Sequence, residues 1–289
     1  MNTSSLKNDS DLHGQLYVVA TPIGNLGEMS SRAVEVLKTV QLIACEDTRH
    51  TKKLCTNFGI ATPLFSYYRE REQQRSEQIM QRLIAGDNIA LVSDAGTPCL
   101  SDPGAVLVKK ARHHNIKVNA VAGPSALAAA LSISGLTESA FFFGGFLPSK
   151  SSERLQHLQA LKTLPYSLIF YESPHRIKNC LQDCIKVFKE RQGMLIRELT
   201  KIHEECIEGT LSCILERVAN GIKGELVLII DGAPKPLASK PEELKELVYW
   251  YRDTQQATLK DTVKSISSDL ELPKSKVYKE VLLLWNENK

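Results

Sequence analysis

Short apolar segments of strand length alternate with amphipathic helical patterns along most of the chain, and this alternation narrows the possible folds. The segments with strand character are 16–20, 42–46, 89–93, 118–122, 141–143, 167–171, 194–197 and 225–231. Pro103, Pro124 and Pro174 stand where helices are expected to begin, and Asp102 and Ser173 are suited to cap two of them. Strands that alternate with helices predict an α/β architecture with a largely parallel sheet.

The predicted strands form two groups, with a seam near residues 120–140, and the end of the chain has helical periodicity without a strand pattern. Between them, GAPKPLASKP contains three prolines in ten residues and is typical of a linker. We predict a polar tail, an N-terminal α/β domain, a C-terminal α/β domain, a linker and a small helical domain. Their ranges are 1–13, 14–123, 124–232, 233–240 and 241–289.

The composition, 43% hydrophobic and 24% charged, is that of an ordinary globular protein. No apolar run has the length of a membrane span, and the polar start lacks the apolar core of a signal peptide. The seven cysteines include no C-x-x-C pair, which fits a reducing compartment. We therefore expect a cytoplasmic protein without a membrane partner. Cys180 and Cys184 share a helix face, where buried thiols are favoured over a zinc site.

Several common motifs are absent from the sequence. It contains no G-x-G, no Walker A motif, no G-x-S-x-G and no H-E-x-x-H. These absences argue against a dinucleotide-binding fold of the Rossmann type, an NTPase, a serine hydrolase and a zincin. The net charge of +3 permits an RNA partner without requiring one.

Polar turns, most of them with glycine, follow four successive predicted strands. They are TPIGNL at 21–26, EDTRH at 46–50, SDAGTP at 93–98 with SDPG at 101–104, and AGPSA at 122–126. Ligands of open α/β sheets bind at the carboxyl ends of strands, and Gly96 and Gly123 allow backbone to approach a ligand closely. These turns therefore predict a binding cleft, with a purely structural use of glycine and proline as the alternative.

Cationic side chains stand near the ends of the later predicted strands as well. They are Lys150, Arg154, His175, Arg176, Arg197 and Lys201, which add to Arg49 in the first half. If they converge near one cleft, they are suited to a phosphate backbone. The alternative is that some of them are structural ion-pair partners of Glu46, Glu172 and Glu198, and both interpretations can hold together.

These motifs, in this order, resemble those of the ribosomal RNA small subunit methyltransferase I family, within the tetrapyrrole-methylase-like class of S-adenosylmethionine (AdoMet) enzymes. The motifs that carry the resemblance are TPIGNL, EDTRHT, SDAGTP, SDPG, GPSA, GFLPSK at 145–150, FYESPHR at 170–176 and RELTK at 197–201. The match extends from about residue 16 to 230, and the tail resembles the family's helix-turn-helix module. The family often has Glu where Gly144 stands, so a role for an acidic residue at this position does not carry over to this chain.

The resemblance implies two α/β domains with AdoMet in the cleft between them and no metal. It also implies 2′-O-methylation of a cytidine in the decoding region of 16S ribosomal RNA, free or within the 30S subunit, and a homodimer. The expected AdoMet-binding residues are Pro22, Asp94, Gly96, Thr97, Ser125, Ala126 and Tyr171. The candidate general bases are Glu46, Asp47, His50, Glu172 and His175. The expected RNA-binding residues are Arg49, Lys150, His175, Arg176, Arg197, Lys201, Lys274 and Lys276.

Two alternative functions stay open at this point. One is AdoMet-dependent C-methylation of a corrin-type tetrapyrrole by the same fold, and the other is an RNA-binding assembly factor without catalysis. The basic strand-end residues and the additional helical domain favour RNA, since a small planar substrate needs no such domain.

The tail is predicted to form three helices around a shared core. The expected core residues are Leu244, Leu247, Val248, Tyr251, Leu259, Val263, Ile266, Val277, Val281 and Leu284. Lys274, Lys276 and Lys279 begin the third helix, where a helix-turn-helix presents its recognition element to phosphates. The alternative is that this surface is the solvated face of a dimerisation module.

Overall fold

The computed structural model describes residues 13–136, 140–234, 243–270 and 272–286. The chain divides into two compact units, Met1–Ala233 and Pro234–Lys289. Residues 1–12 of the predicted N-terminal tail and residues 235–240 of the predicted linker lie outside the described residues. The first unit holds both β-sheets, so the domain boundary proposed between residues 123 and 124 stays a prediction.

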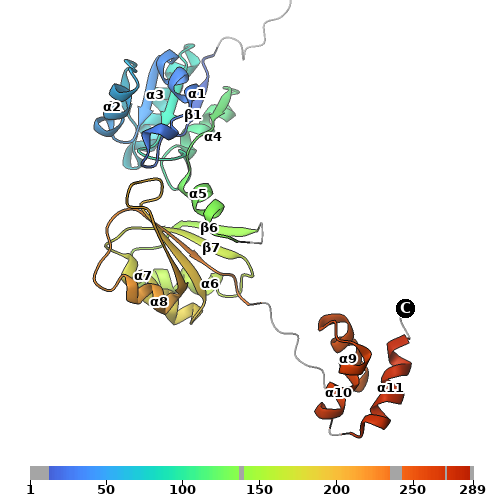
Figure 1. The fold of residues 1–289 in the computed structure, drawn as a ribbon. Helices are drawn as coiled ribbons and strands as arrows, with labels where there is room; N and C mark the ends of the chain where they lie inside the picture. Colours follow the sequence, from blue (N-terminus) through green and yellow to red (C-terminus); the bar gives the residue numbers. More distant parts are fainter. Residues whose placement is uncertain (1–12, 137–139, 235–242, 271, 287–289) are drawn as a thin grey trace, which may run out of the picture. The chain divides into compact units, whose positions relative to one another are not determined.

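The first sheet has the order β3-β2-β4-β1-β5, and all of its strand pairs are parallel. Its strands are β1 (Leu16–Val19), β2 (Leu42–Cys45), β3 (Leu64–Ser66), β4 (Ile89–Val92) and β5 (Val118–Val121). Its helices are α1 (Ser31–Thr39), α2 (Thr48–Asn57), α3 (Glu72–Ile84) and α4 (Ala105–His113), with short 3-10 turns η2 (Leu26–Glu28) and η3 (Arg69–Arg71). Helices α1 and α2 cover one face of the sheet, and α3 and α4 cover the other (Figure 1). We call this part the N-terminal lobe.

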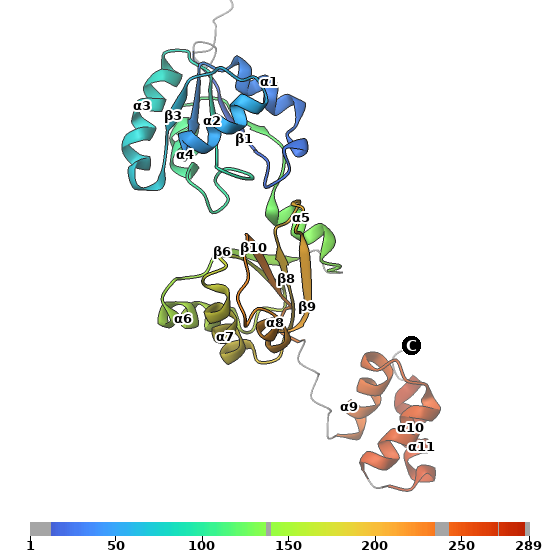
Figure 2. The ribbon, with the colours of Figure 1, turned by 60° about the vertical axis from the view of Figure 1, so that its left-hand side comes forward.

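The second sheet has the order β6-β7-β10-β8-β9, and only β6 and β7 pair in parallel. Its strands are β6 (Phe141–Phe146), β7 (Ser167–Glu172), β8 (Gln192–Arg197), β9 (Glu205–Thr210) and β10 (Leu226–Ile230). Helices α6 (Ser151–Leu161), α7 (Ile177–Phe188) and α8 (Leu211–Arg217) pack on one face, and α5 (Ala126–Ile133) packs on the other (Figure 2). We call this part the C-terminal lobe.

The expectation of a largely parallel sheet is therefore confirmed for the N-terminal lobe and wrong for the C-terminal lobe. The connection at 198–204 is too short for the crossover that parallel neighbours need, so β8 and β9 pair antiparallel. Strand β10 then returns to the middle of the sheet and runs opposite to both of its neighbours. All eight predicted strands are present, whereas β3 and β9 were not predicted.

The predicted helix starts at the prolines are also displaced. Helices α4, α5 and α7 begin two or three residues after Pro103, Pro124 and Pro174, which lie in the preceding turns. Asp102 and Ser173 were expected as N-caps, but Gly104 and Arg176 occupy those positions, so the capping prediction is wrong. The displacement leaves the polar turn residues outside the helices, available to line a cavity.

The second unit is a small helical domain. It contains α9 (Leu244–Tyr249), which continues into the π-helical turn η4 (Trp250–Thr254), then α10 (Leu259–Asp269) and α11 (Lys274–Asn286). Six buried residues form its core, and the other predicted core residues pack against them as partly buried neighbours. The predicted helical core is therefore confirmed. Among the helices that the structure describes, none has the length and apolar character of a membrane span.

Candidate active site

Two turns at the carboxyl ends of the neighbouring strands β1 and β4 are tied to each other. The N–H of Thr21 donates to the carbonyl of Gly96 at 2.9 Å, and the N–H of Gly96 donates back to Thr21 at 3.0 Å. Gly96 has a φ of +79°, and an added Cβ would lie 3.3 Å from Ile23 Cγ2. A side chain is therefore disfavoured at Gly96, and the paired turns form a fixed wall of the site.

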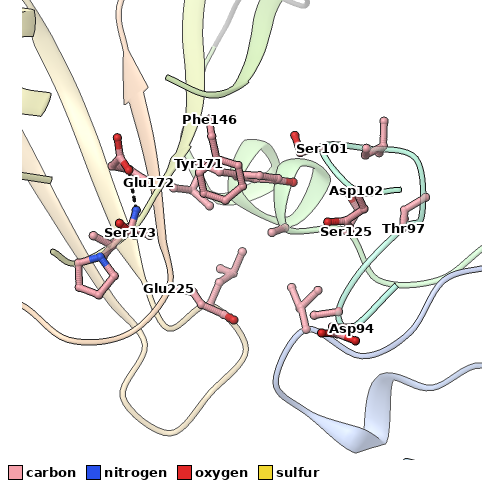
Figure 3. A pocket seen from close by; sticks show the side chains of 18 residues that line it. Asp94, Thr97, Ser101, Asp102, Ser125, Phe146, Tyr171, Glu172, Ser173 and Glu225 are labelled. Carbon is pink, nitrogen blue, oxygen red and sulfur yellow. Dashed lines mark hydrogen bonds between the residues drawn. The ribbon is translucent and has the colours of Figure 1, made fainter. Parts of the chain in front are cut away.

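A cavity of about 350 Å³ opens between these turns and the C-terminal lobe (Figure 3). The N-terminal lobe contributes Ile23, Asp94, Ala95, Thr97, Leu100, Ser101 and Asp102, and Ser125 and Ala126 follow at the start of α5. The C-terminal lobe contributes Phe146, Tyr171, Glu172, Ser173, Pro174, Leu199, Glu225, Leu226 and Val227. The lining thus combines carboxylates, hydroxyls and apolar side chains.

Most of the expected AdoMet-binding residues meet at this cavity. Asp94, Thr97, Ser125, Ala126 and Tyr171 line it. Pro22 lines a second cavity of about 260 Å³, which shares Ile23, Asp94, Ala95 and Glu225 with the first. Gly96 lines neither of the two, but it lies between Ala95 and Thr97, which line the first.

Tyr171 forms an aromatic wall of the first cavity. Its hydroxyl accepts the N–H of Leu127 at 3.0 Å, which fixes the ring against the first turn of α5. The ring also contacts Phe143 and Phe146 edge to face, with centroid distances of 5.0 and 5.7 Å. Burial raises the pKa of the Tyr171 phenol, so the group stays neutral near pH 7. Phe146, which is 53% exposed, extends this wall to the surface.

Asp94 and Asp102 line the N-terminal side of the cavity, and Glu46 and Asp47, which line neither cavity, are neighbours of Asp94. Asp94 accepts the backbone N–H of Asp47 at 3.0 Å through Oδ1. Burial, and then the charge of Asp94, raise the pKa of Glu46. Burial is also the largest cause that raises the pKa of Asp102, with a further contribution from Asp94. Asp102 was not among the predicted site residues: its SDPG turn was expected at the cleft, but the side chain itself was expected to cap a helix.

The other candidate bases have defined surroundings. Asp47 caps α2 and binds the guanidinium of Arg49 at 2.8 and 3.1 Å, which holds the pKa of its carboxyl well below the usual range. Strand alternation turns Glu172 to the sheet face opposite Tyr171, where its Oε1 lies 3.2 Å from Arg176 Nε and accepts the N–H of Ser173 at 2.8 Å. His50 lines the second cavity. These contacts favour structural roles for Asp47 and Glu172.

The lysines and arginines expected at the ends of the later strands have acidic partners. Lys150 lies 3.2 Å from Glu153, Arg197 lies 3.3 Å from Glu205, and Lys201 lies 3.0 Å from Glu198 and 2.9 Å from Glu225. Arg154 is buried against Asp183 at 2.6 Å. Only Lys201 among the expected RNA-binding residues lines one of the two cavities, and His175 is exposed on the turn before α7. On α11, Lys274, Lys276 and Lys279 are exposed.

Lys201 joins the two lobes at the second cavity. A Cβ added to Gly24 would lie 2.4 Å from Lys201 Cγ, so the lysine stem crosses the glycine of the TPIGNL turn. Burial opposes the charged form of Lys201, but hydrogen bonds to Glu225 and Glu198 outweigh it and raise the pKa. The ammonium group is therefore charged near pH 7 and neutralised locally by two carboxylates.

Among the described residues, no group of three or more His, Cys, Asp or Glu side chains is placed to hold a metal ion. Cys180 and Cys184, the pair for which zinc was weighed, are both buried on α7 within the core of the C-terminal lobe.

Comparisons with known proteins identify the family and the fold of this chain. The tetrapyrrole (corrin/porphyrin) methylase family matches residues 15–214. Among solved structures, a diphthine synthase covers 75% of this chain and 89% of its own, with a TM-score of 0.58 and 12% identity. A uroporphyrin-III C-methyltransferase from Thermus thermophilus, complexed with S-adenosylhomocysteine, covers 75% of this chain and 97% of its own, with a TM-score of 0.53 and 16% identity. These structures share the fold of the first unit.

Much closer relatives are known by sequence. Ribosomal RNA small subunit methyltransferase I of Xylella fastidiosa is 50% identical over 234 residues, which are 80% of this chain and 86% of the relative. The same enzyme of Synechocystis is 44% identical over 274 residues, and that of Bacillus subtilis is 40% identical over 286 residues. The two alignments cover 92% and 95% of this chain and 96% of each relative. With this identity over nearly the whole chain, and with a tetrapyrrole methylase fold around the cavity, the chain belongs to the ribosomal RNA small subunit methyltransferase I family.

Proposed function

We propose that this methyltransferase transfers the methyl group of AdoMet to the ribose 2′-hydroxyl of a cytidine in the decoding region of 16S ribosomal RNA. The observation that carries the proposal is the 350 Å³ cavity, in which five of the seven expected AdoMet residues meet. The names of the relatives support small-subunit ribosomal RNA as the substrate. The choice of a cytidine 2′-hydroxyl follows from the motifs that resemble the family.

The residues of the cavity fit AdoMet. The cofactor carries an ammonium and a sulfonium charge together with an adenine ring. Asp94 and Asp102 supply carboxylates for cationic groups, and Ile23, Leu100 and Val227 supply apolar surface for a ring. The Ser125 side chain does not cap the first turn of α5. Tyr171 takes the N–H of Leu127, so the N–H groups of Ala126 and Ala128 are the donors left for a ligand at that end.

Bound AdoMet supplies an electrophilic methyl group, whose bond to sulfur breaks as the bond to the ribose oxygen forms. The protein has to align the hydroxyl with that methyl group and accept the proton that the hydroxyl loses. We assign Glu46 as the general base, because its neighbour Asp47 donates its N–H to Asp94, which lines the cavity, and because burial and Asp94 raise the pKa of the Glu46 carboxyl. A raised pKa makes a carboxylate a stronger base, and a general base typically contributes ~10²–10⁴-fold.

Three further expectations belong to this proposal. The RNA is bound free or within the 30S subunit, and such a substrate places the enzyme in the cytoplasm. The enzyme acts as a homodimer. The apolar surface that we assign to the dimer lies beside α5, which is short and leaves Ile133 and Phe141 45% and 42% exposed. Light scattering of the purified chain, with charged substitutions at Ile133 and Phe141, tests that assignment.

The test of the function supplies the enzyme with methyl-labelled AdoMet and either 16S RNA or 30S subunits. We expect label in a 2′-O-methylcytidine by nucleoside mass spectrometry, and activity that survives exhaustive chelation. Label in a corrin-type tetrapyrrole instead of RNA would overturn the substrate, and RNA binding without any transfer would indicate an assembly factor.

A further inference from the structure

Helix α2 has an exposed face on which cations are present and acids are absent. Within α2, Thr51 and Cys55 are buried and Leu54 is partly buried, so they fix the inner side against the sheet. The outward positions are Arg49, His50, Lys52, Lys53, Thr56 and Asn57, and all six are exposed. The helix sequence TRHTKKLCTN contains no Asp or Glu. A face of this composition favours an anionic partner.

The exposed face consists of two stripes with helical spacing, and each stripe borders a different hollow. His50, Lys53 and Asn57 line the second cavity, which is about 260 Å³. Arg49, Lys52 and Thr56 line a shallow hollow of about 540 Å³ on the other side of the helix. Helix α2 is therefore a ridge between the two hollows, and it lies at the outer edge of the N-terminal lobe (Figure 1).

The cationic side chains on this ridge differ in whether they already have an acidic partner. Arg49 is 88% exposed and is already paired with Asp47 at 2.8 Å. Lys52 and Lys53 form no ion pair with any residue that the structure describes. On the opposite wall of the second cavity, Glu225 is paired with Lys201, and Asp94 accepts the N–H of Asp47. Lys52 and Lys53 are thus the available cations of the ridge.

The second cavity also borders the proposed AdoMet site, since Asp94, Ala95 and Glu225 line both. A ribose whose 2′-hydroxyl reaches that shared wall carries its own phosphodiester a few bonds away. A cation in the second cavity is then suited to hold that phosphodiester, and Lys53 is the cation that lines it without an acidic partner.

We propose that α2 is the RNA-backbone track of this enzyme, with the His50 and Lys53 stripe holding the phosphodiester next to the target ribose and Lys52 holding a neighbouring phosphate across the ridge. The proposal rests on the proposed function for its RNA substrate. It assigns His50 and Lys53 to substrate positioning, and it assigns Arg49 a smaller share because Asp47 already neutralises it.

The double variant Lys52→Ala/Lys53→Ala tests the track. Each lysine–phosphate contact contributes about one unit to the slope of log K against log salt, so the slope should fall by about two. Affinity for 16S RNA at 0.1 M salt should fall by about tenfold per lysine. AdoMet affinity and the thermal midpoint should stay unchanged, because both side chains are exposed and lie outside the first cavity.

The matched control is Lys109→Ala/Lys117→Ala. These two lysines are also exposed, but one lies on α4, on the opposite face of the sheet, and the other precedes β5 at the edge away from the turns. The proposal is overturned if the α2 variant binds and methylates RNA like this control. If the wild-type enzyme did not methylate RNA, the proposed function would be contradicted. The effect of the α2 variant on RNA binding could still be measured in that case.

Discussion

In the N-terminal lobe all strands run in the same direction, whereas in the C-terminal lobe three of the four strand pairs are antiparallel. Parallel strands bring all their carboxyl ends to one edge, so the turns after β1 and β4 and the start of α5 meet at one cavity. In the C-terminal lobe, the ends of β7 and β8 meet the start of β10, with Leu226 opposite both Glu172 and Arg197. A lobe of that kind contributes strand starts as well as strand ends.

The two lobes also differ in how their cations are used. Lys150, Arg154, Arg176, Arg197 and Lys201 of the C-terminal lobe each have an acidic partner. On α2 of the N-terminal lobe, Lys52 and Lys53 have none among the described residues. We infer that these five side chains of the C-terminal lobe mainly hold its structure together, and that Lys52 and Lys53 of α2 mainly meet the substrate.

The largest expected effect tests whether the turns of the N-terminal lobe hold the cofactor. Thr97→Arg places a long charged side chain into the 350 Å³ cavity and should abolish AdoMet binding by calorimetry while the protein stays folded. Thr97→Ser is the control, since it keeps a hydroxyl for the 3.1 Å bond to the carbonyl of Pro124. Unchanged AdoMet affinity in Thr97→Arg would contradict the assignment of this cavity.

The next effect concerns the chemical step. Glu46→Gln should slow single-turnover methyl transfer by ~10²–10⁴-fold while AdoMet affinity changes little. Because burial and Asp94 raise the pKa of Glu46, wild-type activity should fall with decreasing pH above the ordinary range of a glutamate, and this limb should disappear in the variant.

Asp47→Asn is the matched carboxyl-to-amide control for Glu46. Asparagine caps helices as well as aspartate does, and the Asp47 carboxyl is bound to Arg49, so the control should keep its single-turnover rate. A wild-type rate for Glu46→Gln would exclude Glu46 as the base and leave His50, which lines the second cavity, as the next candidate.

The difference between the lobes also decides what could be predicted from the sequence. The turns of the parallel lobe follow predicted strands directly, so Asp94, Thr97 and Ser125 were expected at one cleft, and all three line one cavity. Glu225 and Phe146 were not found, because an antiparallel return and a strand longer than expected bring them to the cavity.

Other features depend on distant contacts that local patterns do not contain. Strand β9 has the sequence ECIEGT, in which two glutamates and a glycine leave no apolar run of strand length. The partner of Arg154 is 29 residues away in the sequence, so its burial could not be inferred. The glycine at position 144 has a structural explanation. An added Cβ would lie 2.6 Å from Phe170 Cε1, so a glutamate there would require that ring to move.

A third effect tests the structural role of cations in the C-terminal lobe. Arg154 and Asp183 are both 3% exposed, and Arg154 also donates to the carbonyls of Pro148 and Ser149 at 3.0 Å. Arg154→Ala should lower the free energy of unfolding by about 3–5 kcal/mol, because it leaves a buried carboxylate without its main partner. The control Lys150→Ala removes an exposed pair and should cost less than about 1 kcal/mol.

The pH dependence of the Arg154→Ala effect can be given a sign. Burial alone would raise the pKa of Asp183, but hydrogen bonds from Lys186, Ser151 and Arg154 lower it. A lowered pKa in the folded state stabilises the protein above the pKa of the unfolded state and loses that contribution as pH falls. The difference between wild type and variant in urea unfolding should therefore be largest near neutral pH and shrink in acid.

The smallest effect extends the comparison to the helical unit. Lys274, Lys276 and Lys279 are exposed at the start of α11, where a helix-turn-helix presents phosphate-binding residues. If they act like the lysines of α2, replacing all three with Ala should reduce the salt slope of RNA binding by up to about three contacts. Truncation after Pro236 should weaken RNA binding in the same sense and leave AdoMet binding intact, since both cavities are lined by the first unit alone. A truncated protein that binds and methylates RNA as well as the full chain would show that these lysines are a solvated face, and that α2 carries the RNA contact without the tail.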